Sequence, residues 1–310
     1  MQQADPAATA ARVLPSSERR HPGTFGLDRM NAEQILRVMN REDEIAVAAV
    51  AAILGDIARL VDDAVDRIRA GGRVHYFGAG TSGRLGLLDA AELPPTFGVP
   101  ADLFAAHLAG GETAVTRAVE GAEDSDEEGR RIATEALRPQ DLAIGLSVSG
   151  TTPFVRGALE GARQRGAATA VITSNDASPL AALSDHVLVA STGAEVLTGS
   201  TRLKAGTATK LILNGFSTAV MIRLGRTYSN LMVSVMATNQ KLRDRTLRIL
   251  AEVTGEDADT NVSLLSQSEN DLAVAVVAAV TGTLPESARA ALDSHQGAVG
   301  GAITALSPGA

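Results

Sequence analysis

The chain has 310 residues, of which 45% are hydrophobic, and its formal net charge at pH 7 is −8. This length is sufficient to bury a full hydrophobic core, whereas an acidic balance without long Lys or Arg runs argues against nucleic acid or membrane as a partner. The absence of cysteine excludes disulfides, thiolate metal sites and a cysteine nucleophile.

The N-terminal stretch has no basic segment followed by an apolar core, so no secretory signal is predicted. The apolar stretches IAVAAVAAIL and LAVAVVAAV are shorter than the roughly 20 residues that span a bilayer. The histidines are scattered without ligand spacing. We therefore expect a cytoplasmic protein that needs no metal.

Residues 1–14 show no pattern and are expected to form a loose tail. From residue 31, apolar residues recur at helical spacing up to Gly71 and Gly72, which predicts a long amphipathic hairpin of two helices. Short apolar runs then alternate with helical patterns, as in RVHYFGAG, DLFAAHLA, DLAIGLSV, TAVITS and HVLVA. This alternation predicts an α/β fold with a doubly wound parallel sheet flanked by helices, whose ligands bind at the carboxyl ends of the strands.

From Lys204 onward the pattern is helical, including the stretch from Asn230 to Leu250. After Thr254, turn signals separate several short helices, which indicates a small C-terminal bundle. We expect one domain over residues 15–250, which includes the N-terminal helices, and a helical bundle over residues 251–310.

Two loops at the predicted strand ends are rich in glycine and hydroxyl side chains. The first follows the G-x-G-x-x-G pattern from Gly78, but the next strand ends in His107 and Leu108 without the acidic residue that a dinucleotide site requires. Its hydroxyls favour a compact phosphorylated ligand at a helix N-terminus. The candidate binding residues of the first loop are Gly80, Thr81, Ser82 and Gly83.

The second loop, LSVSGTTP, follows another predicted strand, and its proline suits the first turn of a helix. Two such loops at one sheet edge can hold a phosphate and sugar hydroxyls without a metal. The candidate binding residues of the second loop are Ser147, Ser149, Gly150 and Thr151.

With these motifs the chain resembles proteins of the sugar isomerase (SIS) fold and, among them, the N-acetylmuramic acid 6-phosphate etherases. The resemblance rests on GAGTSGRLGLLDAAELPPTFGV, AVEGAEDS, SVSGTTPFV and the long block GAEVLTGSTRLKAGTATKLILN, which is shared with glucokinase regulatory proteins. It implies a cofactor-independent homodimer with its active site near the subunit interface. The implied reaction cleaves the lactyl ether of N-acetylmuramic acid 6-phosphate, giving N-acetylglucosamine 6-phosphate and D-lactate.

Glu92 and Glu123 stand where the family has its catalytic pair. A syn elimination followed by addition of water needs one protonated and one ionised carboxyl group. We expect Glu92 to end a helix stopped by Pro94 and Pro95, partly buried, where the helix dipole disfavours negative charge and suits a general acid. Glu123 precedes a predicted helix, with Asp124 and Ser125 as possible caps, and this position suits a general base.

The long shared block adds three candidate substrate contacts, Glu195, Ser200 and Thr201. Two other functions fit the same fold. A sugar-phosphate sensor without chemistry would not need Glu92 and Glu123, and a ketose–aldose isomerase would release no lactate. A sugar-responsive transcription regulator is disfavoured, because no helix-turn-helix segment is evident.

Overall fold

The computed structural model describes residues 15–235 and 240–307. The predicted tail, residues 1–14, lies outside the described residues. At the centre is a five-stranded parallel sheet of strand order β2-β1-β3-β4-β5, which confirms the predicted α/β fold. The strands are β1 (Val74–Gly78), β2 (Phe104–Leu108), β3 (Leu142–Leu146), β4 (Ala168–Thr173) and β5 (His186–Val189).

The strand order reverses beside β1. The chain steps from β1 to β2 on one side, and then crosses back to place β3, β4 and β5 on the other side. In register, Gly78 at the end of β1 pairs with Leu108 of β2 and with Leu146 of β3. The loops that follow β1 and β3 therefore diverge from a topological switch point, where open α/β sheets bind their ligands.

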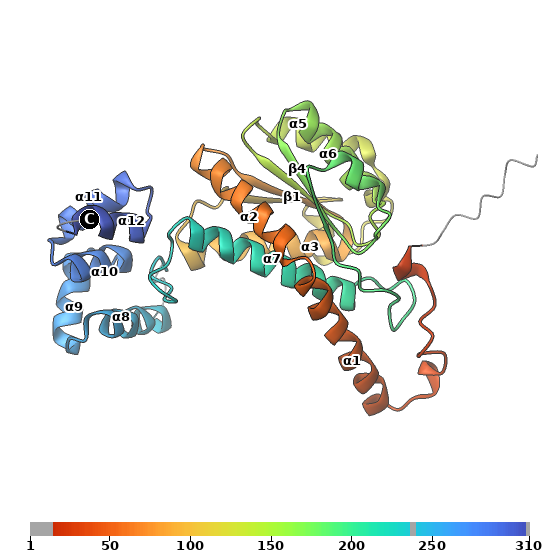
Figure 1. The fold of residues 1–310 in the computed structure, drawn as a ribbon, viewed down its shortest axis with the longest axis horizontal. Helices are drawn as coiled ribbons and strands as arrows, with labels where there is room; N and C mark the ends of the chain where they lie inside the picture. Colours follow the sequence, from red (N-terminus) through yellow and green to blue (C-terminus); the bar gives the residue numbers. More distant parts are fainter. Residues whose placement is uncertain (1–14, 236–239, 308–310) are drawn as a thin grey trace, which may run out of the picture.

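Helices cover both faces of the sheet (Figure 1). On one face α5 (Asp126–Ala136) and α6 (Pro153–Gln164) pack together, and on the other α2 (Leu54–Arg69) and α3 (Gly80–Phe97) pack against α7 (Lys204–Arg223). Successive strand residues point to opposite cores: Tyr76 belongs to the α2, α3 and α7 side and Phe77 to the α5 and α6 side. Burial on both faces explains why the strands are continuous apolar runs.

The N-terminal helices do not form the predicted hairpin. After α1 (Ala32–Ala51), only Ala52 and Ile53 separate it from α2, and their backbone angles (φ −66°, ψ −20° and φ −116°, ψ 16°) are too close to helical to reverse the chain. The two helices follow one another end to end with a bend (Figure 1), and both pack on α7.

Helix α3 also differs from expectation, because it does not stop at Pro94 and Pro95. It continues to Phe97 and ends at Gly98, which adopts a left-handed conformation (φ 61°) and donates its N–H to the Pro94 carbonyl. Prolines in a helix interior remove backbone donors and are costly. Burial of Leu93 and Phe97, one turn apart, offsets this cost.

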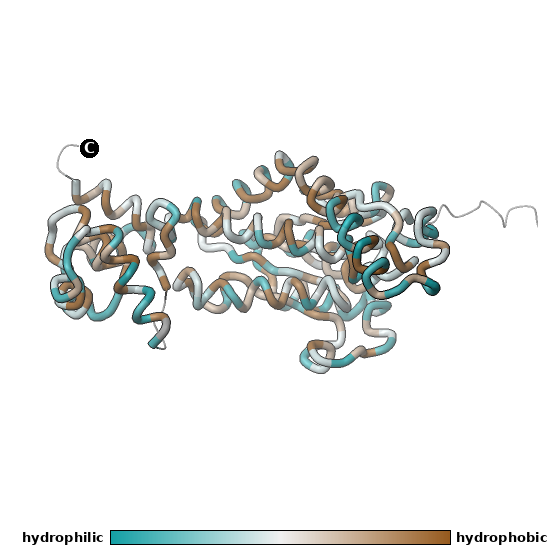
Figure 2. The backbone as a smooth tube through the Cα atoms, turned by 90° about the horizontal axis from the view of Figure 1, so that it is seen from below, coloured by the Kyte–Doolittle hydropathy of each residue, from teal (hydrophilic) through white to brown (hydrophobic). Residues whose placement is uncertain are grey.

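The C-terminal part forms a second lobe beside the sheet (Figures 1 and 2). The predicted helix from Asn230 to Leu250 is wrong in its first part, since residues 230–235 are not helical, and residues 236–239 lie outside the described residues. Val233 and Val235 pack into the core of the bundle together with Leu250. The core of the C-terminal bundle therefore begins before residue 250, where the domain boundary was expected. The helices are α8 (Gln240–Thr254), α9 (Ala258–Gln267), α10 (Leu272–Thr281), α11 (Pro285–Ser294) and α12 (Val299–Leu306).

Across residues 15–235 and 240–307, no helix combines the length and apolarity that crossing a bilayer requires. Nor do His, Asp and Glu side chains within these ranges gather into a group of three or more suited to a metal ion.

Candidate active site

The first predicted loop packs α3 tightly against the sheet. A Cβ on Gly83 would lie 2.6 Å from the Gly78 carbonyl oxygen and 2.4 Å from the Leu108 side chain, so only glycine fits there. The helix begins at Gly80, which has φ 52°, and no side chain caps it at Ala79. Its first amides, beside the half-buried Thr81 and Ser82, therefore form an N-terminus suited to a phosphate.

The second loop is held by its own hydroxyl groups. Ser147 is buried, accepts the Gly150 N–H at 3.1 Å and lies 2.7 Å from the Thr152 hydroxyl. The half-buried Ser149 accepts from the exposed Thr151 hydroxyl at 3.2 Å. Ser147 thus shapes the turn, and Ser149 and Thr151 remain nearest to solvent.

Two residues from the next strand end brace this loop and were not predicted from the sequence. Asn175 donates through Nδ2 to the Ser149 carbonyl at 2.7 Å, and the Ser178 hydroxyl donates to the Gly150 carbonyl at 2.8 Å. Gly150 has φ 69°, and a Cβ there would lie 2.5 Å from Ser178 Oγ. The only sequence signal was the polar run TSNDAS directly after a predicted strand.

The shared block meets the first loop at the start of α7. A Cβ on Gly206 would lie 3.3 Å from the Thr201 carbonyl oxygen and 3.8 Å from the Thr81 side chain. The half-buried Ser200 directly precedes Thr201. The structure thus brings Thr201 and Ser200 to the same edge of the sheet as the first loop.

Glu195 has a different environment from the one expected for a substrate contact. Its side chain is fully buried and accepts the backbone N–H groups of Lys204 and Ala205 at 3.3 and 3.0 Å, across the intervening loop. Burial raises the pKa of Glu195, and these two N–H groups act in the opposite direction. Its carboxylate therefore caps the N-terminus of α7.

Next to this cap, the buried Lys204 ties the N-terminal segment to the shared block. Its Nζ lies 2.5 Å from Glu42 of α1, whose second oxygen lies 3.1 Å from His21 Nε2. Burial acts to raise the pKa of Glu42, but hydrogen bonding and charge from Lys204, together with His21, lower it overall. This cluster fixes where α7 begins.

Glu123 lies in the connection that follows β2, at the same edge of the sheet as the two predicted loops. It belongs to a short 3₁₀-helix, η3 (Ala122–Asp124), and is exposed. Its neighbour Ala122 packs at Gly110, two residues beyond β2, where a Cβ would lie 3.2 Å from the Ala122 Cβ. Ser125 caps α5 through the Glu128 N–H, as predicted, whereas Asp124 does not.

Glu92 is remote from these loops within one chain. It follows Gly80 by about three turns of α3, which at about 1.5 Å per residue places it about 18 Å along the helix axis. Because α3 runs back along the sheet from the end of β1, Glu92 lies toward the opposite edge. It is also exposed, not partly buried as expected. One chain therefore does not bring Glu92 to Glu123.

Two histidines, the buried His75 and the half-buried His107, form a pair between β1 and β2. His75 Nδ1 lies 3.0 Å from His107 Nε2, and the rings are parallel with centroids 5.3 Å apart. Burial, together with the His75 charge, lowers the pKa of His107 to about 4. Burial also lowers the pKa of His75, although the buried Asp141 opposes this.

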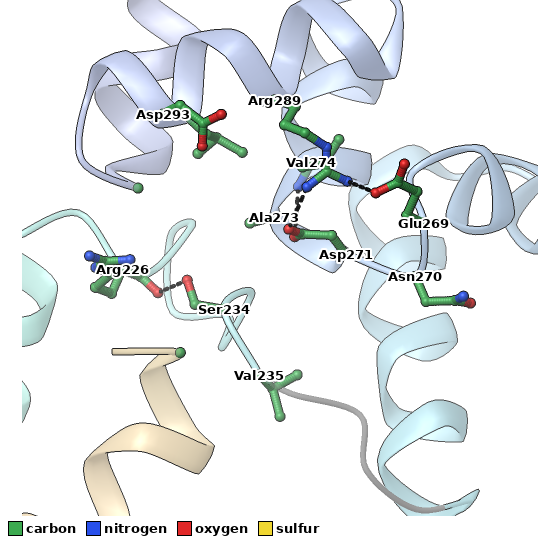
Figure 3. A pocket seen from close by; sticks show the side chains of 13 residues that line it. Arg226, Ser234, Val235, Glu269, Asn270, Asp271, Ala273, Val274, Arg289 and Asp293 are labelled. Carbon is green, nitrogen blue, oxygen red and sulfur yellow. Dashed lines mark hydrogen bonds and ion pairs between the residues drawn. The ribbon is translucent and has the colours of Figure 1, made fainter. Parts of the chain in front are cut away.

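Four cavities of about 430 to 500 Å³ lie elsewhere. None of these four is lined by a predicted site residue. The cavity of about 500 Å³ lies between the C-terminal lobe and Gly98 (Figure 3), and its Arg289 is already paired with Glu269 and Asp271, at 3.2 and 3.5 Å. The candidate site is therefore the open polar edge at the end of β1 and β3.

Comparisons with known proteins show which family the chain resembles. The family models of the glucokinase regulatory protein N-terminal SIS domain and of the SIS domain match residues 56–163 and 123–215. An N-acetylmuramic acid 6-phosphate etherase from Thermobifida fusca is 51% identical over 269 residues, which cover 87% of this chain and 88% of that protein. One from Pectobacterium atrosepticum is 48% identical over 282 residues, covering 91% and 93%. Among solved structures, a phosphoheptose isomerase from Neisseria gonorrhoeae is 18% identical with a TM-score of 0.47, covering 61% of this chain and 97% of that one.

Proposed function

Because the chain belongs to the family of N-acetylmuramic acid 6-phosphate etherases, we propose that it cleaves the D-lactyl ether of N-acetylmuramic acid 6-phosphate with water. The products are N-acetylglucosamine 6-phosphate and D-lactate, as in the recycling of cell-wall amino sugars. The chain is an enzyme of the lyase type, and the scheme below needs no cofactor. The proposed compartment is the cytoplasm, because the charge of phosphorylated sugars retains them inside cells.

The observation that supports this function most directly is the polar edge at the switch point. The uncapped N-terminus of α3 and the hydroxyls of the second loop lie at the ends of neighbouring strands. We assign the substrate phosphate and sugar hydroxyls to this edge. The contacting residues are Gly80, Thr81, Ser82 and Gly83 of the first loop, Ser149, Gly150 and Thr151 of the second, and Ser200 and Thr201 of the shared block, with Ser147 and Glu195 supporting them.

The proposed chemistry is a syn elimination followed by addition of water. An ether oxygen is a poor leaving group, but opening of the sugar ring gives a C1 aldehyde that acidifies the proton on C2. Glu123 removes this proton as base while Glu92 protonates the lactyl oxygen, so the C3–O bond breaks and D-lactate leaves. Water then adds to the double bond, with its oxygen at C3 and a proton at C2.

The separation of Glu92 from Glu123 within one chain supports a homodimer. In a two-fold dimer each chain contributes the same surface, so a residue remote from its own site can complete the site of its partner. We propose that the partner subunit's Glu92 joins Glu123 at the phosphate-binding edge. Exposure of both carboxylates in the single chain leaves them accessible for this arrangement.

Incubation of the purified protein with N-acetylmuramic acid 6-phosphate in ¹⁸O-labelled water tests the function. We expect D-lactate without label and N-acetylglucosamine 6-phosphate labelled at C3, with deuterium at C2 in a parallel run in heavy water. Label in lactate without deuterium at C2 would refute elimination. Isomerised sugar phosphate without lactate would indicate an isomerase, and binding without turnover a sensor. Excess EDTA should leave the rate unchanged, and dependence on a divalent ion would contradict the scheme without a cofactor.

A further inference from the structure

The segment that contains Glu123 has little apolar packing to hold it. It connects β2 to α5 over residues 109–125 and contains only η3 and one turn of helix, α4 (Thr113–Thr116). Ala109 and Ala114 are its buried side chains, whereas Val115 and Val119 are 40% and 39% exposed. Two small buried side chains contribute little hydrophobic stabilisation, so polar contacts must fix the position of this segment.

Arg84 supplies such contacts from α3. Its Nε donates to the carbonyls of Ala114 and Val115, both at 3.0 Å, and its Nη2 donates to the carbonyl of Arg117 at 3.1 Å. These carbonyls lie in the last turn of α4 or just after it, where a helix leaves acceptors without intrahelical partners. A cation at a helix C-terminus is also favoured by the helix dipole.

The backbone of Arg84 is itself rigidly placed. Gly83 before it packs on the end of β1, as described above. Gly86 after it packs on Tyr76, since a Cβ there would lie 3.1 Å from the Tyr76 Cβ. The half-buried Arg84 therefore extends from a fixed point on α3 to the connection between β2 and α5.

A second set of contacts continues from α4 to Glu123. A Cβ on Gly110 would lie 3.2 Å from the Cβ atoms of both Ala114 and Ala122, and 3.0 Å from that of Val119. Ala114 belongs to α4 and Ala122 to η3, directly before Glu123. Fixing the end of α4 therefore also fixes the start of η3.

We propose that Arg84 is a positioning residue for the base Glu123. Its guanidinium holds the connection between β2 and α5 in place by bridging three carbonyls, from the turn of α3 that follows the N-terminus offered to the phosphate. This inference rests on the proposed function for the role of Glu123. The contacts of Arg84 with the connection do not depend on that role.

The test compares Arg84→Lys and Arg84→Met with the wild type. Lysine keeps the charge but is a point donor that cannot bridge three carbonyls, and methionine keeps only the apolar stem. We expect kcat to fall about 10- to 100-fold, more for methionine than for lysine, with KM changed less than about 3-fold. Exchange of the C2 proton of N-acetylglucosamine 6-phosphate in heavy water should fall by the same factor, because it reports the base directly. Arg131→Gln, which removes an exposed guanidinium from α5, is the matched control and should leave all these values unchanged.

Amide hydrogen exchange supplies a readout that needs no turnover. In both Arg84 variants, amides of residues 112–124 should exchange about 10-fold faster, with those of α5 and α6 unchanged. If the wild type released no lactate, the proposed function would fail while this measurement still tested the contacts. Unchanged exchange in this segment would overturn the inference, as would a KM increase above about 10-fold with kcat preserved, which would make Arg84 a phosphate ligand.

Discussion

Mixed dimers provide a direct test of whether Glu92 and Glu123 act across the subunit interface. Glu92→Gln and Glu123→Gln chains with different affinity tags are co-expressed, and the mixed dimer is isolated by sequential purification on both tags. Each homodimer should lose about 10²- to 10⁴-fold in kcat, since every site lacks its acid or its base. The distance of about 18 Å along α3 between Gly80 and Glu92 predicts a different outcome for the mixed dimer.

In the mixed dimer, one site combines both substituted residues and the other combines Glu92 with Glu123. Lactate release per dimer should therefore recover to about half of the wild-type rate. If both carboxylates acted within one chain, each site would lack one of them and the rate would stay at or below about 1%. A dimer of wild type with a Glu92→Gln, Glu123→Gln double variant gives the reverse pattern: inactive for sites that span two chains, and about half active for sites within one chain. A half-active dimer of this second kind, together with an inactive dimer of the two single variants, would refute the arrangement proposed here.

Three further predictions follow from the loops and the core. Ser82→Ala and Ser149→Ala should each raise KM for the phosphorylated sugar about 10-fold or more, with a smaller effect on kcat, because these hydroxyls are expected to contact the ligand before and during the reaction. Equal rates of the wild type on phosphorylated and unphosphorylated N-acetylmuramic acid would contradict a phosphate site. Gly83→Ala should lower the free energy of unfolding, measured in urea, by about 1–3 kcal/mol, because its Cβ would lie 2.6 Å from a carbonyl oxygen of β1. The control Gly215→Ala, on α7 with open space around it, should be neutral or stabilising. The pKa of His107 is about 4 in the folded protein and about 6.5 when unfolded, so the unfolded chain takes up a proton between these pH values and the folded protein does not. The free energy of unfolding should therefore fall as the pH falls through this window, by on the order of 3 kcal/mol. A His107→Leu variant with the same acid sensitivity would contradict this origin.

Much of the sheet was predictable from the sequence, as was the position of the two polar loops at the ends of neighbouring strands. The central strands β1, β3 and β4 are buried on both faces and therefore appear as short apolar runs, and each is followed by turn or hydroxyl residues. The glycine pattern from Gly78 to Gly83 also has a local physical cause, the close contact of α3 with β1. Features whose cause lies within a few residues, such as the Ser125 cap of α5, are accessible in this way.

The errors arose where contacts distant in sequence decide the outcome. Pro94 alone predicts a helix end, but burial of Phe97 in the core extends the helix by another turn. Glu195 is a charged residue in the shared block and was therefore expected to contact the substrate. Its hydrogen-bond partners are instead the backbone N–H groups of Lys204 and Ala205, across a loop. The role inferred for Arg84 depends on carbonyls about thirty residues away, and no local pattern marks it.

The several roles assigned to α3 follow from its rigidity. Its N-terminus faces the proposed phosphate site, Arg84 on its second turn holds the segment of the base, and Glu92 near its end is the acid proposed for the partner subunit. A carboxylate must be placed within a fraction of an ångström to act on one sugar atom, and two carboxylates from different chains meet that demand only if their supports do not bend. Tight contact of Gly83 and Gly86 with β1, and the bonds of the buried Asp89 with the Tyr76 and Ser217 hydroxyls at 3.0 and 3.1 Å, hold this helix to the sheet and to α7. The same rigidity would allow a change at the phosphate end to affect the acid of the neighbouring site, so loss of the Asp89 contacts should lower kcat through Glu92 before it weakens substrate binding.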